Sequence, residues 1–156
     1  MAKLAIIAHG GAGADPRKKS NVEKAIQQGS SLLESDACAV DAAVEACVIL
    51  ENDPAFNAGT GSVTRLDGSV LVDASIHVSD GRLGFVASMP ETPNPIRVAE
   101  ALLDEEINGR GGIGAREWAD QRGIPRSAVT PRPLGKTTSG DTVGVIAMDS
   151  EGVMAT

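Results

Sequence analysis

The sequence is short of the residues on which most enzyme active sites depend. Its 156 residues include two histidines, two cysteines and no tyrosine, and aromatic residues make up only 2%. A Ser-His-Asp relay or a multi-histidine zinc site therefore has little to draw on. With so few aromatics, the hydrophobic core has to be built from Ala, Val, Ile and Leu.

Positive charge and long apolar runs are also scarce. The 14 Lys and Arg stand against 21 Asp and Glu, which gives a formal net charge of −7. Such an acidic chain repels nucleic-acid backbones and anionic membranes. The apolar run Leu4–Ala8 is too short for a signal-peptide core or a membrane span. We therefore expect no nucleic acid and no membrane as partners, and a cytoplasmic location.

The two cysteines, Cys38 and Cys47, fall on one expected helix. Nine residues of helix would separate them by roughly 13–14 Å along the axis, whereas a disulfide needs Cα atoms within about 7 Å. Because the helix is apolar on most sides, both are interpreted as buried, inert thiols. Free thiols are typical of a reducing compartment.

Apolar stripes at helical spacing predict four helices. The first is expected at 21–33 with Asn21 as its cap, and the second at about 36–50 with Ser35 or Asp36 as its cap. Pro95 begins a third helix at 95–108. The fourth is expected at 115–122.

Short apolar runs and turn dipeptides predict the strands. A buried strand is expected at 3–8. Asp-Gly turns predict two hairpins, which join 63–66 to 69–73 and 74–78 to 82–88. The last two strands are expected at 142–148 and 153–156. Helices early and late with antiparallel strands between them indicate an α+β fold, with part of one sheet missing from this chain.

Two glycine loops are candidates for a binding role. The loop 9–16 follows the first strand, but it lacks the G-x-G-x-x-G spacing and the P-loop lysine of phosphate sites. Its glycines permit a close approach of the backbone to another group. A non-catalytic small-ligand-binding module that uses its HGGAG segment therefore remains an open interpretation. The second loop, FNAGTGS, occupies 56–62.

Thr142 opens a strand directly after a Pro/Gly-rich segment, 123–141, which we expect to be a flexible connector. Threonine at the start of a strand has an ordinary structural use, because its β-branched side chain favours extended backbone. As a nucleophile, its hydroxyl would need a base. The α-amine freed by cutting the preceding bond is such a base, with a pKa of about 8. A connector that leads into a rigid strand suits this self-processing.

Three motifs, in this order and at these separations, resemble the plant-type L-asparaginase/isoaspartyl peptidase family. They are HGGAG after the first strand, FNAGTGSV after an apolar helix, and GDTVGVIAMDSEG after the connector. The resemblance extends from about residue 4 to the C-terminus. It implies an N-terminal-nucleophile hydrolase with an αββα sandwich fold, incomplete in this chain.

The resemblance also implies a mechanism. Such a precursor cuts itself at the bond that is here Asp141–Thr142, when the Thr142 hydroxyl attacks the Asp141 carbonyl and an N→O acyl shift gives an ester that water hydrolyses. The freed Thr142 amine then assists its own hydroxyl. The substrates would be L-asparagine, giving L-aspartate and ammonia, or β-aspartyl (isoaspartyl) dipeptides. No cofactor is needed for this chemistry.

Supporting residues are carried over by motif. Asn57 is similar to the family asparagine beside the nucleophile, and Gly10 and Gly11 match the loop that passes close to the threonine. The segment LENDPAFNAGT resembles a sodium-binding loop. It implies a structural sodium ion held by the backbone carbonyls of Leu50, Glu51, Asp53, Phe56, Ala58 and Thr60.

The same resemblance divides the chain into an α-subunit-like part, 1–141, and the truncated start of a β-subunit-like part, 142–156. The family residues that grip the substrate and form the oxyanion hole have no counterpart here. The fragment alone is thus expected to be inactive, and to need the remaining β-subunit segment and assembly into a homo-oligomer of α/β units. Because Asp141 precedes the threonine, a glycosylasparaginase-like amidase is an alternative, although HGGAG favours the asparaginase.

Overall fold

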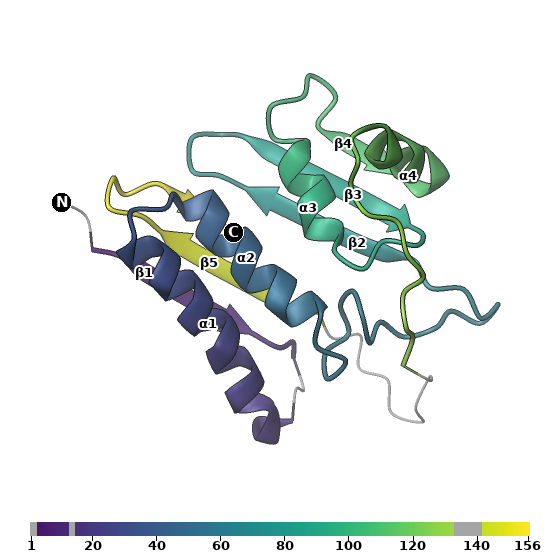
Figure 1. Ribbon diagram of the computed structural model, residues 1–156, viewed down its shortest axis with the longest axis horizontal. Coiled ribbons are helices and arrows are strands. Elements are labelled where there is room, and N and C mark those ends of the chain that lie inside the picture. The colour runs from purple at the N-terminus through teal and green to yellow at the C-terminus, as the bar shows by residue number, and fades with distance from the viewer. Residues whose placement is uncertain (1–2, 13–14, 133–141) are drawn as a thin grey trace.

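The computed structural model describes residues 3–12, 15–132 and 142–156, and it has the mixed α+β architecture that the sequence predicts (Figure 1). Two three-stranded sheets have the orders β1-β5-β6 and β2-β3-β4, and every pair is antiparallel except the parallel pair β3–β4. The strands are β1 (Ala5–His9), β2 (Val72–His77), β3 (Leu83–Met89), β4 (Gly109–Gly111), β5 (Gly144–Met148) and β6 (Met154–Ala155). The helices are η1 (Pro16–Lys18), α1 (Lys19–Glu34), α2 (Ala39–Glu51), α3 (Pro95–Ala101) and α4 (Gly112–Gln121).

Strand β6 joins the two sheets edge to edge. On one side Ala155 pairs with Ala147 of β5, and on the other it forms an antiparallel bridge with Val78, just beyond β2. The backbones of His77 and Thr156 exchange two hydrogen bonds, with N···O distances of 2.8 and 2.9 Å. The described strands therefore form one continuous surface in the order β1-β5-β6-β2-β3-β4.

The helices pack on one face of this surface. Residues opposite each other in neighbouring strands point to the same face, and Ala147, Ala155 and Val78 are all buried in one core with α1 and α2. Helix α3 packs against β2 and β3, and α4 packs against β3, where Trp118 lies in a second buried cluster. Figure 1 shows α1, α2 and α3 on the same side of the strands.

The other face of the sheet carries exposed apolar side chains. Ile7 of β1 is 63% exposed and pairs directly with Ile146 of β5, which is 42% exposed. Met154 of β6 and Phe85 of β3 are also exposed. Apolar side chains thus occur on both faces of the sheet, but the helices cover only one of them.

The structure confirms the hairpin predicted for 74–88, which is the pair β2–β3, but not the one predicted for 63–73. At 63–73 only the turn forms, with the Arg65 nitrogen 2.8 Å from the Ser69 oxygen. Val63 instead makes a parallel bridge with Arg132, which is 69 positions later in the sequence. A long-range pairing has replaced the local one.

The third helix is shorter than predicted. It ends at Ala101 rather than at 108, and the chain then turns into β4, a strand that the sequence analysis missed. The pairing brings Gly109 opposite Phe85, where a Cβ atom would lie 2.1 Å from the ring. Glycine therefore leaves room for the Phe85 ring at a position where the apolar rhythm gave no strand signal.

The predicted caps of α1 and α2 are wrong. Helix α1 begins at Lys19, so Asn21 lies inside it, and α1 runs on to Glu34. Asp36, with a φ of 61°, reverses the chain after α1 instead of capping the next helix. The cap of α2 is Cys38, whose Sγ accepts a hydrogen bond from the Asp41 nitrogen at 3.5 Å.

The prediction of two buried thiols is also wrong for Cys38, which is exposed because it lies at the helix end. Cys47 is half-buried, and desolvation raises the pKa of its thiol, which keeps it protonated. Both cysteines are free, as predicted. Among the helices described, none is long and apolar enough to cross a membrane.

Candidate active site

A cleft of about 790 Å³ lies between the loop that follows α2 and the strands β2 and β3. Its lining includes Asn57 from that loop and Thr142 from the segment that precedes β5. The structure thus brings together the predicted nucleophile and its predicted supporting asparagine, which lie far apart in the sequence. The residues of β2 and β3 that complete the lining are Val72, Asp73, Ala74, Ser75, Leu83, Phe85 and Val86.

Thr142 is exposed. Its Oγ1 donates a hydrogen bond of 3.4 Å to the carbonyl of the adjacent Val143. Two residues later the chain enters β5 at Gly144, which pairs with His9 of β1. The strand therefore fixes the backbone next to Thr142, while the hydroxyl itself is open to the cleft. Asp141, the other half of the predicted cleavage site, lies outside the described residues.

The predicted glycine loop packs between the two sides of the site. Gly10 is buried against Phe56 of the FNAG segment, because a Cβ atom on Gly10 would lie 2.3 Å from the Phe56 ring. Gly11 adopts a φ of 96°, in the region that favours glycine, and its nitrogen donates to Nδ1 of His9 at 3.1 Å. The loop therefore packs on the FNAG segment, and its predicted approach to Thr142 stays a prediction.

His9 is a residue that the sequence analysis did not assign to the site. Its ring lies over Gly144, where a Cβ atom would be 2.3 Å from Nε2. The imidazole thus shapes the Gly10–Gly11 loop through Nδ1 and fills the space beside the start of β5. In the sequence, the position of His9 at the end of a strand and before two glycines could have indicated that it belongs to the site.

Asn57 shapes the turn that it belongs to. Its Oδ1 accepts a hydrogen bond of 2.9 Å from the Val63 nitrogen. Gly59 and Gly61, with φ of 46° and 93°, permit the tight path between them. The amide of Asn57 is therefore held at the cleft by its own loop.

Glu51 was considered only for its carbonyl, but its side chain belongs to the cleft. It is 2% exposed; Oε1 accepts from the Ile96 nitrogen and Oε2 from Nδ2 of Asn94, each at 3.1 Å. Burial raises the pKa of Glu51 to about 8, and the hydrogen bonds from Asn94 and Ile96 oppose this only in part. A carboxyl at the end of an otherwise apolar helix was the sequence signal for a buried acid.

The loop from Asp53 to Ser62 is also held from outside. The Ala55 carbonyl accepts hydrogen bonds from Nζ of Lys18 and from Nη1 of Arg132, the latter at 3.4 Å. Asn21 of α1 donates to Oδ2 of Asp53 at 2.6 Å, and Oδ1 of Asp53 accepts from the Ala55 nitrogen at 2.9 Å. Side chains from α1, the connector and the loop itself therefore fix this side of the cleft.

The six carbonyls predicted to hold sodium lie at the end of α2 and in the turns after it. Three of them already accept backbone hydrogen bonds: Leu50 from the Asn52 and Asp53 nitrogens, Glu51 from Thr60 at 2.7 Å, and Asp53 from Phe56. A carbonyl oxygen has two lone pairs, so Glu51 and Asp53 each keep one, and oxygen atoms are the ligands that hard cations take. No cluster of three or more His, Cys, Asp or Glu suited to a metal occurs in the described part of the chain.

Comparisons with known proteins identify the family of the chain. A family model described as asparaginase matches residues 2–132. A rat protein named isoaspartyl peptidase/L-asparaginase is 32% identical over 97% of this chain and 54% of its own length. A Pyrococcus abyssi protein named plant-type L-asparaginase is 39% identical over 78% of this chain and 42% of its own length. The chain spans about half the length of the curated relatives that it matches.

Proposed function

Because the chain belongs to the asparaginase family, we propose that the full-length protein is an autoprocessing threonine amidohydrolase. It cuts its own Asp141–Thr142 bond and then hydrolyses L-asparagine to L-aspartate and ammonia, β-aspartyl dipeptides, or both. The observation that carries this proposal is the shared cleft of Thr142 and Asn57, the two residues to which the motifs assign the nucleophile and its support.

In the intact chain the nitrogen of Thr142 is a peptide nitrogen and cannot act as a base. In the first step the Thr142 hydroxyl attacks the Asp141 carbonyl, the C–N bond breaks and an ester forms, and the threonine nitrogen becomes an amine. Water then hydrolyses the ester. The exposed hydroxyl and the strand that begins at Gly144 support this step, because the nucleophile is accessible while its backbone is held.

In the second reaction the new amine accepts the proton of the Thr142 hydroxyl, which attacks the amide carbonyl of the substrate. Ammonia, or the amine of the second residue of a dipeptide, leaves with that proton. Water attacks the resulting ester and releases aspartate, so the threonine is regenerated. Asn57 supports the nucleophile from the opposite side of the cleft, and its bond to the Val63 nitrogen keeps it in place.

The uncovered sheet face supports an αββα sandwich that is only half present here. Ile7, Ile146 and Met154 point away from the helices and are exposed, and burying each apolar side chain contributes about 1.5–3 kcal/mol. A second sheet from the remaining β-subunit segment would cover them. We propose that this segment also supplies the residues that grip the substrate, and that the α/β units form homo-oligomers.

A sodium ion at the carbonyls after α2 is part of the same proposal. The donor set fits such an ion, because its oxygens are neutral and the loop curls back over α2: a Cβ atom on Gly59 would lie 2.6 Å from the Glu51 oxygen. When bound, sodium would hold this loop beside Asn57 and would take no part in the chemistry. Melting of the full-length protein at a higher temperature in sodium chloride than in choline chloride would support it.

The experiment that tests the proposal compares full-length wild-type protein with Thr142→Val and Thr142→Ser. Wild type should release ammonia from L-asparagine or cleave β-aspartyl-leucine, Thr142→Val should do neither and stay uncut, and Thr142→Ser should retain part of both functions. Wild-type activity on a glycosylated asparagine alone would indicate the glycosylasparaginase-like alternative. Full activity in Thr142→Val would overturn the proposed nucleophile.

A further inference from the structure

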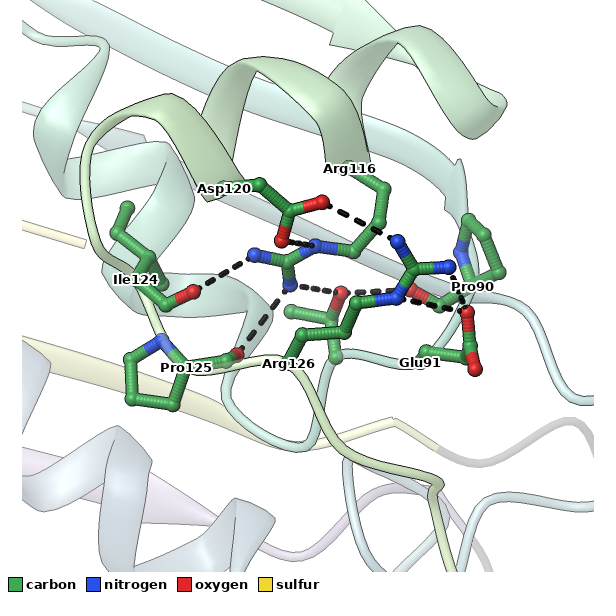
Figure 2. Close-up of polar contacts among 8 residues, drawn as sticks. Pro90, Glu91, Arg116, Asp120, Ile124, Pro125 and Arg126 are labelled. Carbon is green, nitrogen blue, oxygen red and sulfur yellow. Dashed lines mark hydrogen bonds and ion pairs between the residues drawn. The ribbon is translucent and has the colours of Figure 1, made fainter.

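The connector after α4 is tied to the rest of the protein at its upstream end by a buried arginine. Arg116 is completely buried, and Figure 2 shows its guanidinium between α4 and the connector. It donates to the carbonyls of Ile124 and Pro125 at 2.8 and 3.3 Å, to Oδ1 of Asp120 at 3.0 Å and to Oγ1 of Thr92 at 2.8 Å. Each partner is therefore held to a charge that cannot move into solvent.

A second tie follows immediately along the connector. The Ser127 nitrogen donates to the Glu91 carbonyl at 3.1 Å, and the Arg126 guanidinium pairs with the carboxylates of Glu91 and Asp120 (Figure 2). Glu91 has a φ of 49°, a conformation that costs a non-glycine residue about 1 kcal/mol or more. The turn that receives the connector is thus kept in an unfavourable shape by its contacts.

The third tie attaches the connector to the loop of the cleft. The Arg132 nitrogen donates to the Ser62 carbonyl at 2.9 Å, and the Gly61 nitrogen donates to the Thr130 carbonyl at 2.9 Å. Arg132 also forms the parallel bridge with Val63, the residue whose nitrogen is bonded to Asn57. The connector therefore reaches the same loop that carries the supporting asparagine (Figure 1).

The sequence around Arg132 favours this pairing. Prolines precede and follow it, in the order Pro131-Arg132-Pro133. A residue before proline is restricted to extended backbone, and prolines have no N–H. Arg132 thus carries the only backbone donor of the three residues, in a conformation suited to a strand pair, and the structure shows this donor bonded to Ser62.

We propose that the connector docks on the cleft before the chain is cut, and that Arg132 is a positioning residue for the self-cleavage at Thr142. This inference rests on the proposed autoprocessing. Docking holds the chain ten positions ahead of Thr142, because only the nine residues 133–141 separate it from Arg132. The two ends of this span are then fixed near one cleft, which raises the effective concentration of the junction at the site.

The length of the span gives the expected size of the effect. Without the bonds of Arg132, the nearest upstream tie is the Thr130 carbonyl, which accepts from the Gly61 nitrogen, and the span to Thr142 grows from nine residues to eleven, 131–141. Loop-closure entropy scales with the logarithm of the length to the power 3/2, so cleavage should slow about 1.4-fold. If the chain is free from Gly123 onwards, the span is nineteen residues and the slowing is about threefold.

The test follows the cleavage rate of freshly made full-length precursor by gel or mass spectrometry. Arg132→Pro removes the N–H and the guanidinium but leaves the Thr130 carbonyl bonded to Gly61, and should slow cleavage about 1.4-fold. Independently, five Gly/Ser residues inserted after Arg132 lengthen the span to fourteen with the tie intact, and should slow cleavage about twofold. The matched control is Arg126→Gln, an arginine of the same connector upstream of the tie, which should cleave at the wild-type rate.

The second readout separates positioning from general stability. The insertion leaves Arg132 and its bonds to the cleft loop in place, so kcat/KM and the melting temperature of the fully matured insertion variant should equal those of the wild type. Wild-type cleavage rates in both the Arg132→Pro and the insertion variants would overturn the inference, as would equal losses of cleavage rate and mature kcat/KM in the insertion variant. A Thr142→Val precursor that is still cut at this junction would instead overturn the proposed function.

Discussion

Two parts of the cleft are held in different ways. The loop wall, residues 53–62, is fixed by Lys18 and Arg132 at the Ala55 carbonyl and by Asn21 at Asp53. The nucleophile segment, Thr142–Val143, directly precedes β5, and its exposed Thr142 hydroxyl lies 3.4 Å from the Val143 carbonyl. The loop wall keeps its shape through contacts with distant residues, and the nucleophile segment presents a hydroxyl to the cleft.

This difference is what the proposed chemistry requires. A supporting amide must be positioned before the reaction, since a displacement of about 1 Å can cost about a hundredfold in rate. The nucleophile has to serve two reactions, first on its own peptide bond and then on a substrate, so its hydroxyl cannot be committed to a strong partner. Substitutions in the loop wall should therefore affect stability, and substitutions at Thr142 should affect chemistry alone.

Within the loop wall, the largest effect is expected from Asn57→Ala in the full-length protein. Removal of the amide should lower kcat/KM about 10²-fold, the effect of losing one positioned hydrogen-bonding group, and should cost about 1 kcal/mol because the Val63 nitrogen loses its acceptor. Steady-state kinetics and urea unfolding measure the two effects. Asn108→Ala is the control, since Asn108 bonds to Phe85 through its carbonyl. Wild-type kinetics in Asn57→Ala would remove Asn57 from the site.

Next in size is Gly10→Ala, which tests the packing of the glycine loop on the loop wall. The added Cβ would meet the Phe56 ring at 2.3 Å, so we expect a loss of about 1–3 kcal/mol from overpacking. The matched control is Gly114→Ala in α4, where no atom lies within 4 Å of the added Cβ and a gain of about 0.5–1 kcal/mol is expected. Thermal unfolding of both variants measures these effects. Equal melting temperatures would contradict the close packing of Gly10 on the Phe56 ring.

Glu51→Gln tests the buried acid behind the loop wall through pH. The pKa of Glu51 is raised by burial to about 8 from its ordinary 4.5. The protonated carboxyl thus stabilises the folded state fully below pH 4.5, and this contribution is lost as the pH rises towards 8. Between pH 4.5 and 8, the free energy of unfolding of the wild type should therefore fall by roughly 1 kcal/mol per pH unit relative to that of Glu51→Gln.

The measurement is urea unfolding of both proteins between pH 5 and 8. Sodium-free buffer is needed, because a cation bound at the nearby carbonyls would lower the pKa of Glu51. If the free energies of unfolding of the two proteins change equally with pH across this range, Glu51 is not a neutral, buried acid.

Asn21→Ala should give a smaller loss. It removes the 2.6 Å bond to Asp53, half-buried between α1 and the loop wall, which contributes about 1 kcal/mol. The neighbouring Ser20→Ala changes an exposed side chain with only a 3.4 Å contact to Asn21, so it should stay within about 0.5 kcal/mol of the wild type. Equal urea midpoints for the two variants would mean that α1 does not brace the loop.

The smallest change in stability is expected in the nucleophile segment, Thr142–Val143. Thr142→Val keeps the β-branched shape and removes a hydroxyl that is exposed, so the uncut precursor should unfold within about 0.5 kcal/mol of wild-type precursor. Its activity should be lost all the same. A destabilisation above about 1 kcal/mol, measured by urea unfolding, would mean that the Thr142 hydroxyl stabilises the fold, as the contacts of the loop wall do.

Local patterns in the sequence predicted the parts of the fold that are locally determined. The apolar run after Lys3 became β1, and alternation on both sides of Asp80-Gly81 became the β2–β3 hairpin. The same Asp-Gly signal at Asp67-Gly68 formed its turn but no hairpin, because Val63 pairs with Arg132. Such a partner, far away in the sequence, leaves no trace in local periodicity.

For the candidate site, too, the sequence indicated what local motifs carry and missed what contacts between distant segments determine. Motifs led to Thr142 and Asn57, which the structure places in one cleft, while their roles stay predictions. The side chains of Glu51 and Arg132 were missed, because a buried carboxyl with its partner at Asn94, and a connector arginine docked on Ser62, depend on contacts between distant segments. Long-range polar contacts are visible only in the folded chain.

The claim on which the account depends is that Thr142 becomes a nucleophile with an amine of its own. Intact-mass spectrometry of purified, catalytically active full-length protein tests it most directly. The account predicts two chains, of which one ends at Asp141 and the other begins with Thr142. A single uncut chain that hydrolyses L-asparagine or β-aspartyl-leucine at the full rate would contradict it.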